Sequence, residues 1–152
     1  MADRPHLQRG AIEKICPIVL RAKHGAPDIL SFQHPVAGKQ FVKGTIQRGE
    51  APITAAYREL YEESGIVAVG DLLPLGACKI GQPPLRWHFF VWRASELPNA
   101  WQYQTLDDYG HIFSFFWHPL SQPLDAAWHS NFHEAHAYIA PLIRKRLCSG
   151  SV

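Results

Sequence analysis

Three glutamates at helical spacing are the feature of this chain that most constrains its fold. Glu59, Glu62 and Glu63 lie at positions i, i+3 and i+4 of residues 52–64, a stretch composed mostly of good helix formers. The proline at the start of this stretch suits a first helical turn, and Gly65 suits a left-handed C-terminal cap. We therefore expect a helix that carries all three carboxylates on one face.

Such a face destabilises the folded protein when nothing is bound to it. The carboxylates repel one another, and they lie near the helix end at which the dipole disfavours anions. A solvated, glutamate-rich face is the common origin of a run of this kind. The alternative is a hard divalent cation, Mg²⁺ or Mn²⁺, which takes oxygen ligands and removes the repulsion.

Arg58, within the helix, and the loop before it could support such a cation site. Arg58 stands four residues before Glu62 and can also reach Glu50, so it can tie the preceding loop to the helix. Gly44 and Gly49 let the loop backbone approach a metal or a phosphate closely.

Strand and turn patterns occur on both sides of this helix. Apolar and β-branched runs predict strands, Gly- and Pro-rich stretches predict loops, and a second periodic segment predicts a final helix that Pro141 should kink or interrupt. The expected strands are 15–21, 29–34, 66–69, 72–80, 85–92 and 111–117; the loops are 35–49 and 94–110; the final helix runs from about 126 or 128 to 147. This pattern predicts a mixed α/β sandwich, with residues 1–152 forming one domain whose core spans roughly 10–147.

Composition excludes several other classes. A net charge of +2 is too small for a dedicated nucleic-acid binder, and no apolar run approaches the roughly 18 residues of a membrane span. The N-terminal segment has no apolar core of the kind a secretory signal needs. Three widely spaced cysteines argue against a disulfide framework and a zinc ribbon. We therefore expect a cytoplasmic protein.

Residues 44–66 match the Nudix box, G-x5-E-x7-R-E-U-x-E-E-x-G-U with U an aliphatic residue, at every defined position. The chain thus resembles the Nudix hydrolases, and the resemblance implies their α/β/α sandwich. It also implies a Mg²⁺-dependent hydrolase, with Mn²⁺ as the possible substitute, that cleaves a nucleoside diphosphate linked to another moiety X. Carried over by position, the metal ligands are the three box glutamates and the Gly44 carbonyl, while Glu50 pairs with Arg58. The implied catalytic residues within the box are Glu59, Glu62 and Arg58.

The box leaves the general base open, because family members differ in where it lies. A carboxylate in the polar stretch before the last strand is the natural candidate, and we expect Asp108 before Asp107, with Glu96 as a further possibility. Ordinary turn residues are the alternative for both aspartates. His111 and His118 could also reach the site, although a histidine at a strand end is more often packed.

Substrate identity is less constrained by the sequence. Lys43, Arg48 and Trp87 are expected to contact the substrate, and the Lys43–Gly44 pair is similar to the opening of the box in diadenosine polyphosphate and diphosphoinositol branches. The candidate substrates are a nucleoside triphosphate, a dinucleoside polyphosphate or a nucleotide sugar, bound by a monomer or a homodimer. Two alternatives remain: a catalytically silent nucleotide-binding or regulatory domain, which usually lacks box glutamates, and an isomerase of the isopentenyl diphosphate type, which should carry an active-site cysteine.

Histidines and tryptophans give weaker signals. His129, His133 and His136 have a spacing that could bind Zn²⁺, but no fourth ligand is evident and we expect a surface or interface face. Four tryptophans at strand spacing are expected in the core or at its rim, with one at most reaching substrate; they are Trp87, Trp92, Trp101 and Trp117.

Overall fold

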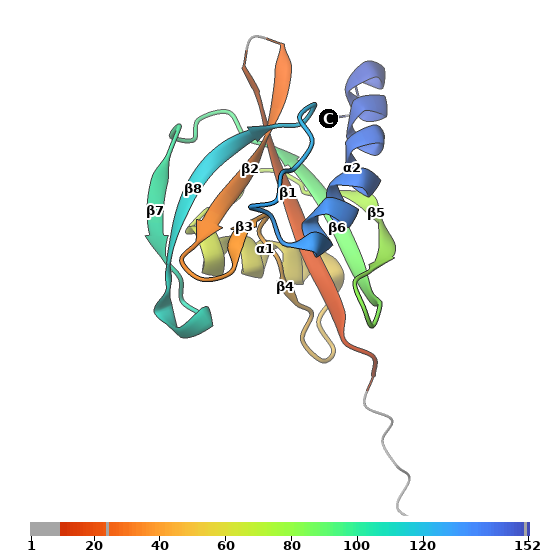
Figure 1. The fold of residues 1–152 in the computed structure, drawn as a ribbon. Helices are drawn as coiled ribbons and strands as arrows, with labels where there is room; N and C mark the ends of the chain where they lie inside the picture. Colours follow the sequence, from red (N-terminus) through yellow and green to blue (C-terminus); the bar gives the residue numbers. More distant parts are fainter. Residues whose placement is uncertain (1–9, 24, 151) are drawn as a thin grey trace, which may run out of the picture.

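A mixed β-sheet forms the centre of the protein, and one helix packs against each of its faces (Figure 1). The computed structural model describes residues 10–23, 25–150 and 152. The strands are β1 (Glu13–Lys23), β2 (Ala26–His34), β3 (Gly38–Gln40), β4 (Gly44–Thr45), β5 (Leu73–Ile80), β6 (Leu85–Arg93), β7 (Trp101–Gln104) and β8 (Ile112–Pro119). The helices are α1 (Pro52–Ser64) and α2 (Ser130–Ser149), with a 3-10 turn η1 (Asp108–Gly110).

The sheet runs in the order β5-β6-β1-β2-β8-β7, and the short strands β3 and β4 pair with β2 and β1. Strands β1 and β6 are parallel, whereas β1 with β2, β2 with β8, β5 with β6 and β7 with β8 are antiparallel. The loop–helix–loop of residues 44–66 covers one face, and α2 covers the other (Figure 1). The expected α/β sandwich is therefore confirmed.

Strand β1 shows why a nearly continuous apolar run lies at the centre of this sheet. Cys16, Ile18 and Leu20 belong to the core beneath α2, whereas Ile15 and Val19 face the side of α1. A strand covered on both faces has no polar side to present, so its sequence loses the alternation of a half-exposed strand.

Helix α1 begins and ends where the sequence predicts. Pro52 opens it, and Gly65 follows its last residue with a left-handed backbone (φ 77°) and an N–H that donates to the Tyr61 carbonyl at 2.8 Å. Ala55, Ala56 and Leu60 form the fully buried stripe against the sheet. The small alanines bring the helix close to the sheet, which places the glutamates beside β1 and β4.

Two segments differ from the expected elements. Residues 66–69 are not a strand: Val67 and Val69 are exposed after the chain reverses at Gly65, and these β-branched residues have no neighbouring strand to pair with. Residues 94–110 are not all loop, because Trp101–Gln104 forms the edge strand β7 against β8 and η1 follows. This edge strand spans only four residues, in which half-buried aromatic side chains alternate with exposed glutamines.

Pro141 does not interrupt α2, contrary to expectation. Pro141 and Ala137, whose carbonyl loses its helical donor, both lie on the exposed side of the helix, where water can hydrate that carbonyl. The helix starts at Ser130, after the His129 side chain accepts the N–H of Asn131. In the described residues, no helix is both long and apolar enough to cross a membrane.

The histidines expected to form a surface face make backbone contacts. His133 lies within 2.9 Å of the Asp125 carbonyl, and His136 lies within 3.0 Å of the Leu120 carbonyl. These contacts dock the start of α2 onto the segment that follows β8, so the spacing of the histidines is explained by packing.

Candidate active site

A polar cleft of about 420 Å³ contains the three box glutamates. Glu59, Glu62 and Glu63 enter it from the last two turns of α1. Strands β1 and β4 and the β7–β8 loop supply the opposite walls, which consist of Lys14, Lys43, Gly44, Thr45, Gln47, Leu106 and Asp107. The spacing that predicts one carboxylate face therefore produces one cleft.

Arg58 organises this cleft. Its guanidinium donates to both carboxylate oxygens of Glu50, each at 2.8 Å, and thereby fixes the loop that precedes the helix. The same group donates to Glu59 at 2.8 Å and to Glu62 at 3.1 Å. It also donates to the Thr45 carbonyl at 3.0 Å, so one side chain joins β4, the loop and the helix.

Gly44 has a steric role at the cleft. A Cβ atom built at this position would lie 1.8 Å from Cδ of Glu59, which is far inside contact distance. The carboxylate of Glu59 thus occupies the space that any side chain at residue 44 would need. A side chain at residue 44 would have to displace this carboxylate.

The electrostatics of the glutamates favour a bound cation. Burial raises the pKa of Glu63 well above its ordinary value, even though the carboxylate accepts the N–H of Lys43 at 3.1 Å. Burial also raises the pKa of Glu59, against the opposing effect of Arg58. By contrast, hydrogen bonds from Arg58 lower the pKa of the Glu50 carboxyl to about 2.

This donor set fits a hard divalent cation. Glu59 and Glu63 are held where their charged forms are disfavoured, and their oxygens face a cleft that holds further oxygen donors. A cation that binds there would stabilise both negative charges, and all-oxygen ligands are those that Mg²⁺ and Mn²⁺ prefer.

Two lysines also line the cleft. The ammonium of Lys43 lies over the rings of Trp87 and Phe132, at 5.7 Å and 5.5 Å from their centroids. Lys43 was expected from the sequence, and Lys14 was not. Lys14 lies opposite Thr45 in the β1–β4 pairing, and its Nζ donates to the Thr45 hydroxyl at 2.7 Å. Burial, followed by the charge of Lys43, lowers the pKa of Lys14. Because Lys14 joins the cleft through strand pairing 31 residues away, no local pattern could have identified it.

The loop aspartates take different places. Asp107 lines the cleft, and its charge contributes to the raised pKa of Glu59. Asp108 instead directs one carboxylate oxygen to His34 at 2.6 Å. Both aspartates act on the box glutamates, because the charge of Asp108 contributes to the raised pKa of Glu63, but of the two only Asp107 lines the cleft. Glu96 lines a separate cavity.

Two expected substrate contacts lie elsewhere. Trp87 is 2% exposed and packs against Phe89 and Phe132 in the core beneath α2, so its ring has no free face for a substrate and the expectation is corrected. Its position in the parallel β1–β6 pair, covered by α2, explains the burial. Arg48 is exposed at the turn of the box loop and borders a neighbouring depression instead of the glutamate cleft.

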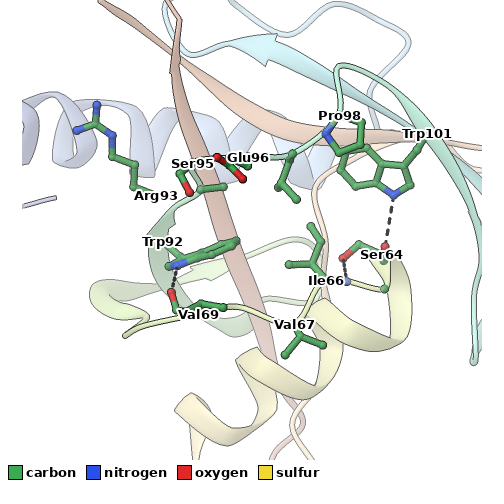
Figure 2. Close-up of a pocket in the computed structure, with 13 residues that line it drawn as sticks. Ser64, Ile66, Val67, Val69, Trp92, Arg93, Ser95, Glu96, Pro98 and Trp101 are labelled. Atoms are coloured by element: carbon green, nitrogen blue, oxygen red, sulfur yellow. Dashed lines mark hydrogen bonds between the residues drawn. The ribbon is translucent and has the colours of Figure 1, made fainter.

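A larger cavity of about 650 Å³ lies beyond the C-terminal end of α1 (Figure 2). Trp92 and Trp101 border it, and the indole N–H of each donates to a backbone carbonyl, of Val69 at 3.0 Å and of Ser64 at 3.4 Å. The two rings are thereby held in place at an apolar wall. None of the three box glutamates lines this cavity, so the chemistry that they can support belongs to the smaller polar cleft.

Comparison with known proteins shows the family to which this chain belongs. The NUDIX domain family matches residues 15–141 of the chain. The chain therefore belongs to the NUDIX family. No curated protein matches its sequence.

Solved structures share the fold at low sequence identity. The NUDIX domain of Shewanella oneidensis NrtR, solved in complex with ADP ribose, has a TM-score of 0.67 at 13% identity and covers 95% of this chain and 94% of its own. A binary complex of the Caenorhabditis elegans Ap4A hydrolase has a TM-score of 0.66 at 15% identity, with 91% and 99% covered. The MutT protein of Methanosarcina mazei Go1 has a TM-score of 0.61 at 16% identity, with 92% and 98% covered. These likenesses show the fold of this chain.

Proposed function

We propose that this protein is a divalent-metal-dependent pyrophosphohydrolase, which splits the diphosphate linkage of a nucleoside diphosphate joined to a second group X. One observation carries the proposal: the glutamates Glu59, Glu62 and Glu63 share one polar cleft with the lysines Lys14 and Lys43. Such a site pairs a cation-binding wall with a phosphate-binding wall, as hydrolysis of a phosphoric anhydride requires.

Each wall has a defined task. The box glutamates and the Gly44 carbonyl would hold Mg²⁺ or Mn²⁺, and a bound cation there neutralises phosphate charge and acidifies coordinated water. Lys14 would attract the phosphate oxygens of the substrate, and the charge of Lys43, which acts on Glu63 from over the rings of Trp87 and Phe132, would assist it. Arg58 keeps Glu59 and Glu62 in place and remains protonated, because its hydrogen bonds to Glu50 raise its pKa further.

A carboxylate outside the box would orient or deprotonate the attacking water. Asp107 is the candidate, since it lines the same cleft from the β7–β8 loop. The loop is fastened to the box helix by the Leu106 N–H, which donates to the Glu62 carbonyl at 3.2 Å. This hydrogen bond holds the backbone of the loop beside the box helix.

Substrate candidates remain nucleoside triphosphates, dinucleoside polyphosphates and nucleotide sugars. The shared fold with an ADP-ribose-bound NUDIX domain and with an Ap4A hydrolase supports including ADP-ribose and Ap4A among the compounds tested. We further propose a monomer or homodimer that forms one domain, acts in the cytoplasm on small nucleotides and has no dedicated nucleic-acid-binding role.

A nucleotide panel tests the proposal. Purified protein is incubated with ATP, Ap4A, ADP-ribose and a nucleotide sugar in the presence of Mg²⁺, and the products are resolved by chromatography. We expect at least one compound to be cleaved between two phosphorus atoms. Failure to cleave any of them by folded, Mg²⁺-loaded protein would favour the silent nucleotide-binding alternative.

An isomerase of the isopentenyl diphosphate type has less support. Among the described residues that line the cleft, none is a cysteine. Cys16 is fully buried, and burial raises the pKa of its thiol, which keeps it protonated. The panel, extended with isopentenyl diphosphate, would reveal that activity directly.

A further inference from the structure

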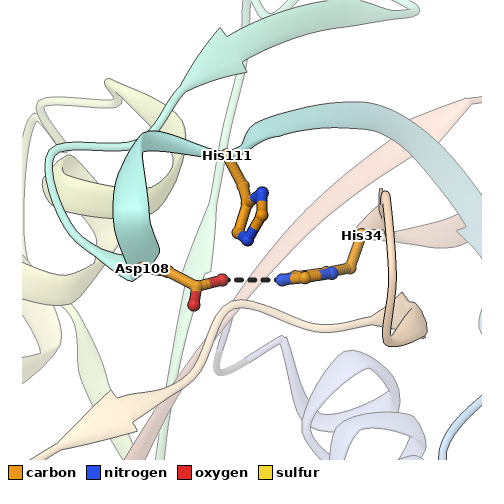
Figure 3. A group of neighbouring side chains, drawn as sticks. All are labelled: His34, Asp108 and His111. Atoms are coloured by element: carbon orange, nitrogen blue, oxygen red, sulfur yellow. Dashed lines mark hydrogen bonds and ion pairs between the residues drawn. The ribbon is translucent and has the colours of Figure 1, made fainter.

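His34, Asp108 and His111 form a cluster (Figure 3), and Asp108 directly follows Asp107, which lines the glutamate cleft. His34 ends β2, Asp108 opens η1, and His111 follows it. Nε2 of His34 lies 2.6 Å from Oδ2 of Asp108, and the two imidazole rings meet edge to face with centroids 5.1 Å apart. One potential ligand atom from each residue lies within 4.8 Å of the others, which on spacing alone could suit a metal ion.

The hydrogen bonds of His34 oppose a metal. Its Nδ1 accepts two backbone N–H groups, from Val36 at 3.0 Å and from Ala37 at 2.9 Å. A neutral imidazole carries one ring proton. If that proton were on Nδ1, it would point at the N–H groups of Val36 and Ala37, which are themselves donors. The ring proton therefore lies on Nε2, which donates it to Asp108 and has no lone pair left for a metal.

The loop that receives this hydrogen bond has a strained backbone. Asp108 and Tyr109 have φ angles of 48° and 58°, in the left-handed region that residues other than glycine seldom adopt. Side chains hold the turn: Asp107 accepts the N–H of Asp108 at 2.7 Å, and His34 holds the carboxylate of Asp108. Without the second contact, the chain has less to stabilise two successive left-handed residues.

We propose that His34 is a positioning residue, which holds Asp108 and thereby the turn that directs Asp107 into the glutamate cleft. The inference rests on the proposed function, because Asp107 is the cleft carboxylate assigned to the water. The buried face of β2 makes His34 a rigid anchor: its side chain is 9% exposed, whereas that of Asp108 is 40% exposed.

Two variants separate the contacts of His34. In His34→Asn the short amide can still accept the N–H groups of Val36 and Ala37, but it cannot reach Asp108. In His34→Gln the longer amide places an N–H near the position of Nε2 and restores a donor to Asp108. We expect His34→Asn to lower kcat about 10-fold or more with KM within about twofold of wild type, and His34→Gln to recover most of that loss.

A double-mutant cycle with Asp107→Asn tests the route of the effect. If His34 acts through Asp107, the combined His34→Asn and Asp107→Asn variant should be scarcely slower than Asp107→Asn alone. Fully additive losses, or a kcat of His34→Asn within twofold of wild type, would overturn the proposal.

Nitrogen-15 NMR of the histidine rings tests the geometry without turnover, so it remains decisive if the panel finds no substrate. We expect His34 in the Nε2–H form, and Asp108→Ala should shift its Nε2 resonance. A protonated Nδ1, or Zn²⁺-induced shifts of both His34 and His111, would overturn the proposal in favour of a metal site. If wild type hydrolyses a nucleotide and His34→Asn is equally active, this inference is wrong and the proposed function stands. If His34 carries its proton on Nε2 but the protein hydrolyses nothing, the proposed function is wrong and the contact of His34 with Asp108 stands.

Discussion

Gly44 and Glu59 occupy one another's space: the carboxyl carbon of Glu59 lies 1.8 Å from where a Cβ of residue 44 would be. The relationship joins a strand residue to a helix residue across the cleft. It makes the glycine of the box a requirement of side-chain packing, in addition to any use of its carbonyl oxygen.

Gly44→Ala should therefore abolish most activity without unfolding the protein. The new methyl group must push the Glu59 carboxylate away, and a displacement of about 1 Å can cost roughly 100-fold in rate. Mg²⁺ affinity, measured by titration calorimetry, should fall as well. Gly10→Ala is the matched control, since a Cβ at Gly10 would have nothing within 4 Å; equal effects of the two substitutions would contradict the steric account.

Glu50→Gln tests the pairing with Arg58 through pH. The folded pKa of Glu50 is about 2, below its ordinary value of 4.5, and hydrogen bonds from Arg58 are the main cause. A lowered carboxyl pKa stabilises the folded state above pH 4.5, and this contribution disappears as pH falls towards 2. The difference in unfolding free energy between wild type and Glu50→Gln, from urea titrations, should be full at pH 6 and shrink steadily below pH 4.5. A difference that does not change over this range would remove Glu50 from the network.

Glu63→Gln should stabilise the protein when metal is withheld. Burial raises the pKa of Glu63, so its ionised form opposes folding at neutral pH, and the neutral amide oxygen can still accept the N–H of Lys43. In EDTA, we expect the melting temperature to rise by about 2–5 °C. Glu96→Gln, at an exposed site outside the cleft, is the control and should change nothing.

The same raised pKa predicts proton release when Mg²⁺ binds, because the cation displaces protons from the buried carboxyls. The calorimetric heat of Mg²⁺ binding should thus vary with the ionisation enthalpy of the buffer. A heat that is the same in all buffers, together with a Glu63→Gln variant that melts below wild type in EDTA, would place Glu63 in a purely structural network.

Asp107→Asn should lower kcat by about 100-fold or more and leave KM nearly unchanged, if this carboxylate orients or deprotonates the water. Asp108→Asn should be milder, since an amide oxygen can still accept the Nε2–H of His34. Steady-state kinetics on the best nucleotide of the panel would decide. A larger loss at Asp108 than at Asp107 would show that the turn presents the other aspartate during turnover.

The sequence predicts the parts of this site that are local. Glu59, Glu62 and Glu63 share a face because helix geometry fixes their spacing, and the contact of Arg58 with Glu62 follows from the same helix. Lys14 reaches the site because β1 pairs with β4. His34 reaches it through its contact with Asp108, 74 residues further along the chain. No local sequence pattern encodes either contact.

The sequence also did not predict correctly which side chains are buried. Trp87 was expected to reach substrate, but its strand is paired in parallel with β1 and covered by α2, which buries the ring. Val67 and Val69 show the opposite error, because β-branched residues predict a strand only where a neighbouring strand is available to pair.

The most direct test of the central claim is the rate of nucleotide cleavage by wild type and Glu62→Gln, each with Mg²⁺ and with excess EDTA. Glu62 lines the cleft, and its loss removes a proposed cation ligand without opening the core. We expect wild type to be active with Mg²⁺ alone, Glu62→Gln to be at least about 100-fold slower, and Glu96→Gln to match wild type. Cleavage that persists in EDTA, or that Glu62→Gln performs at the wild-type rate, would contradict a metal-dependent hydrolase centred on this cleft.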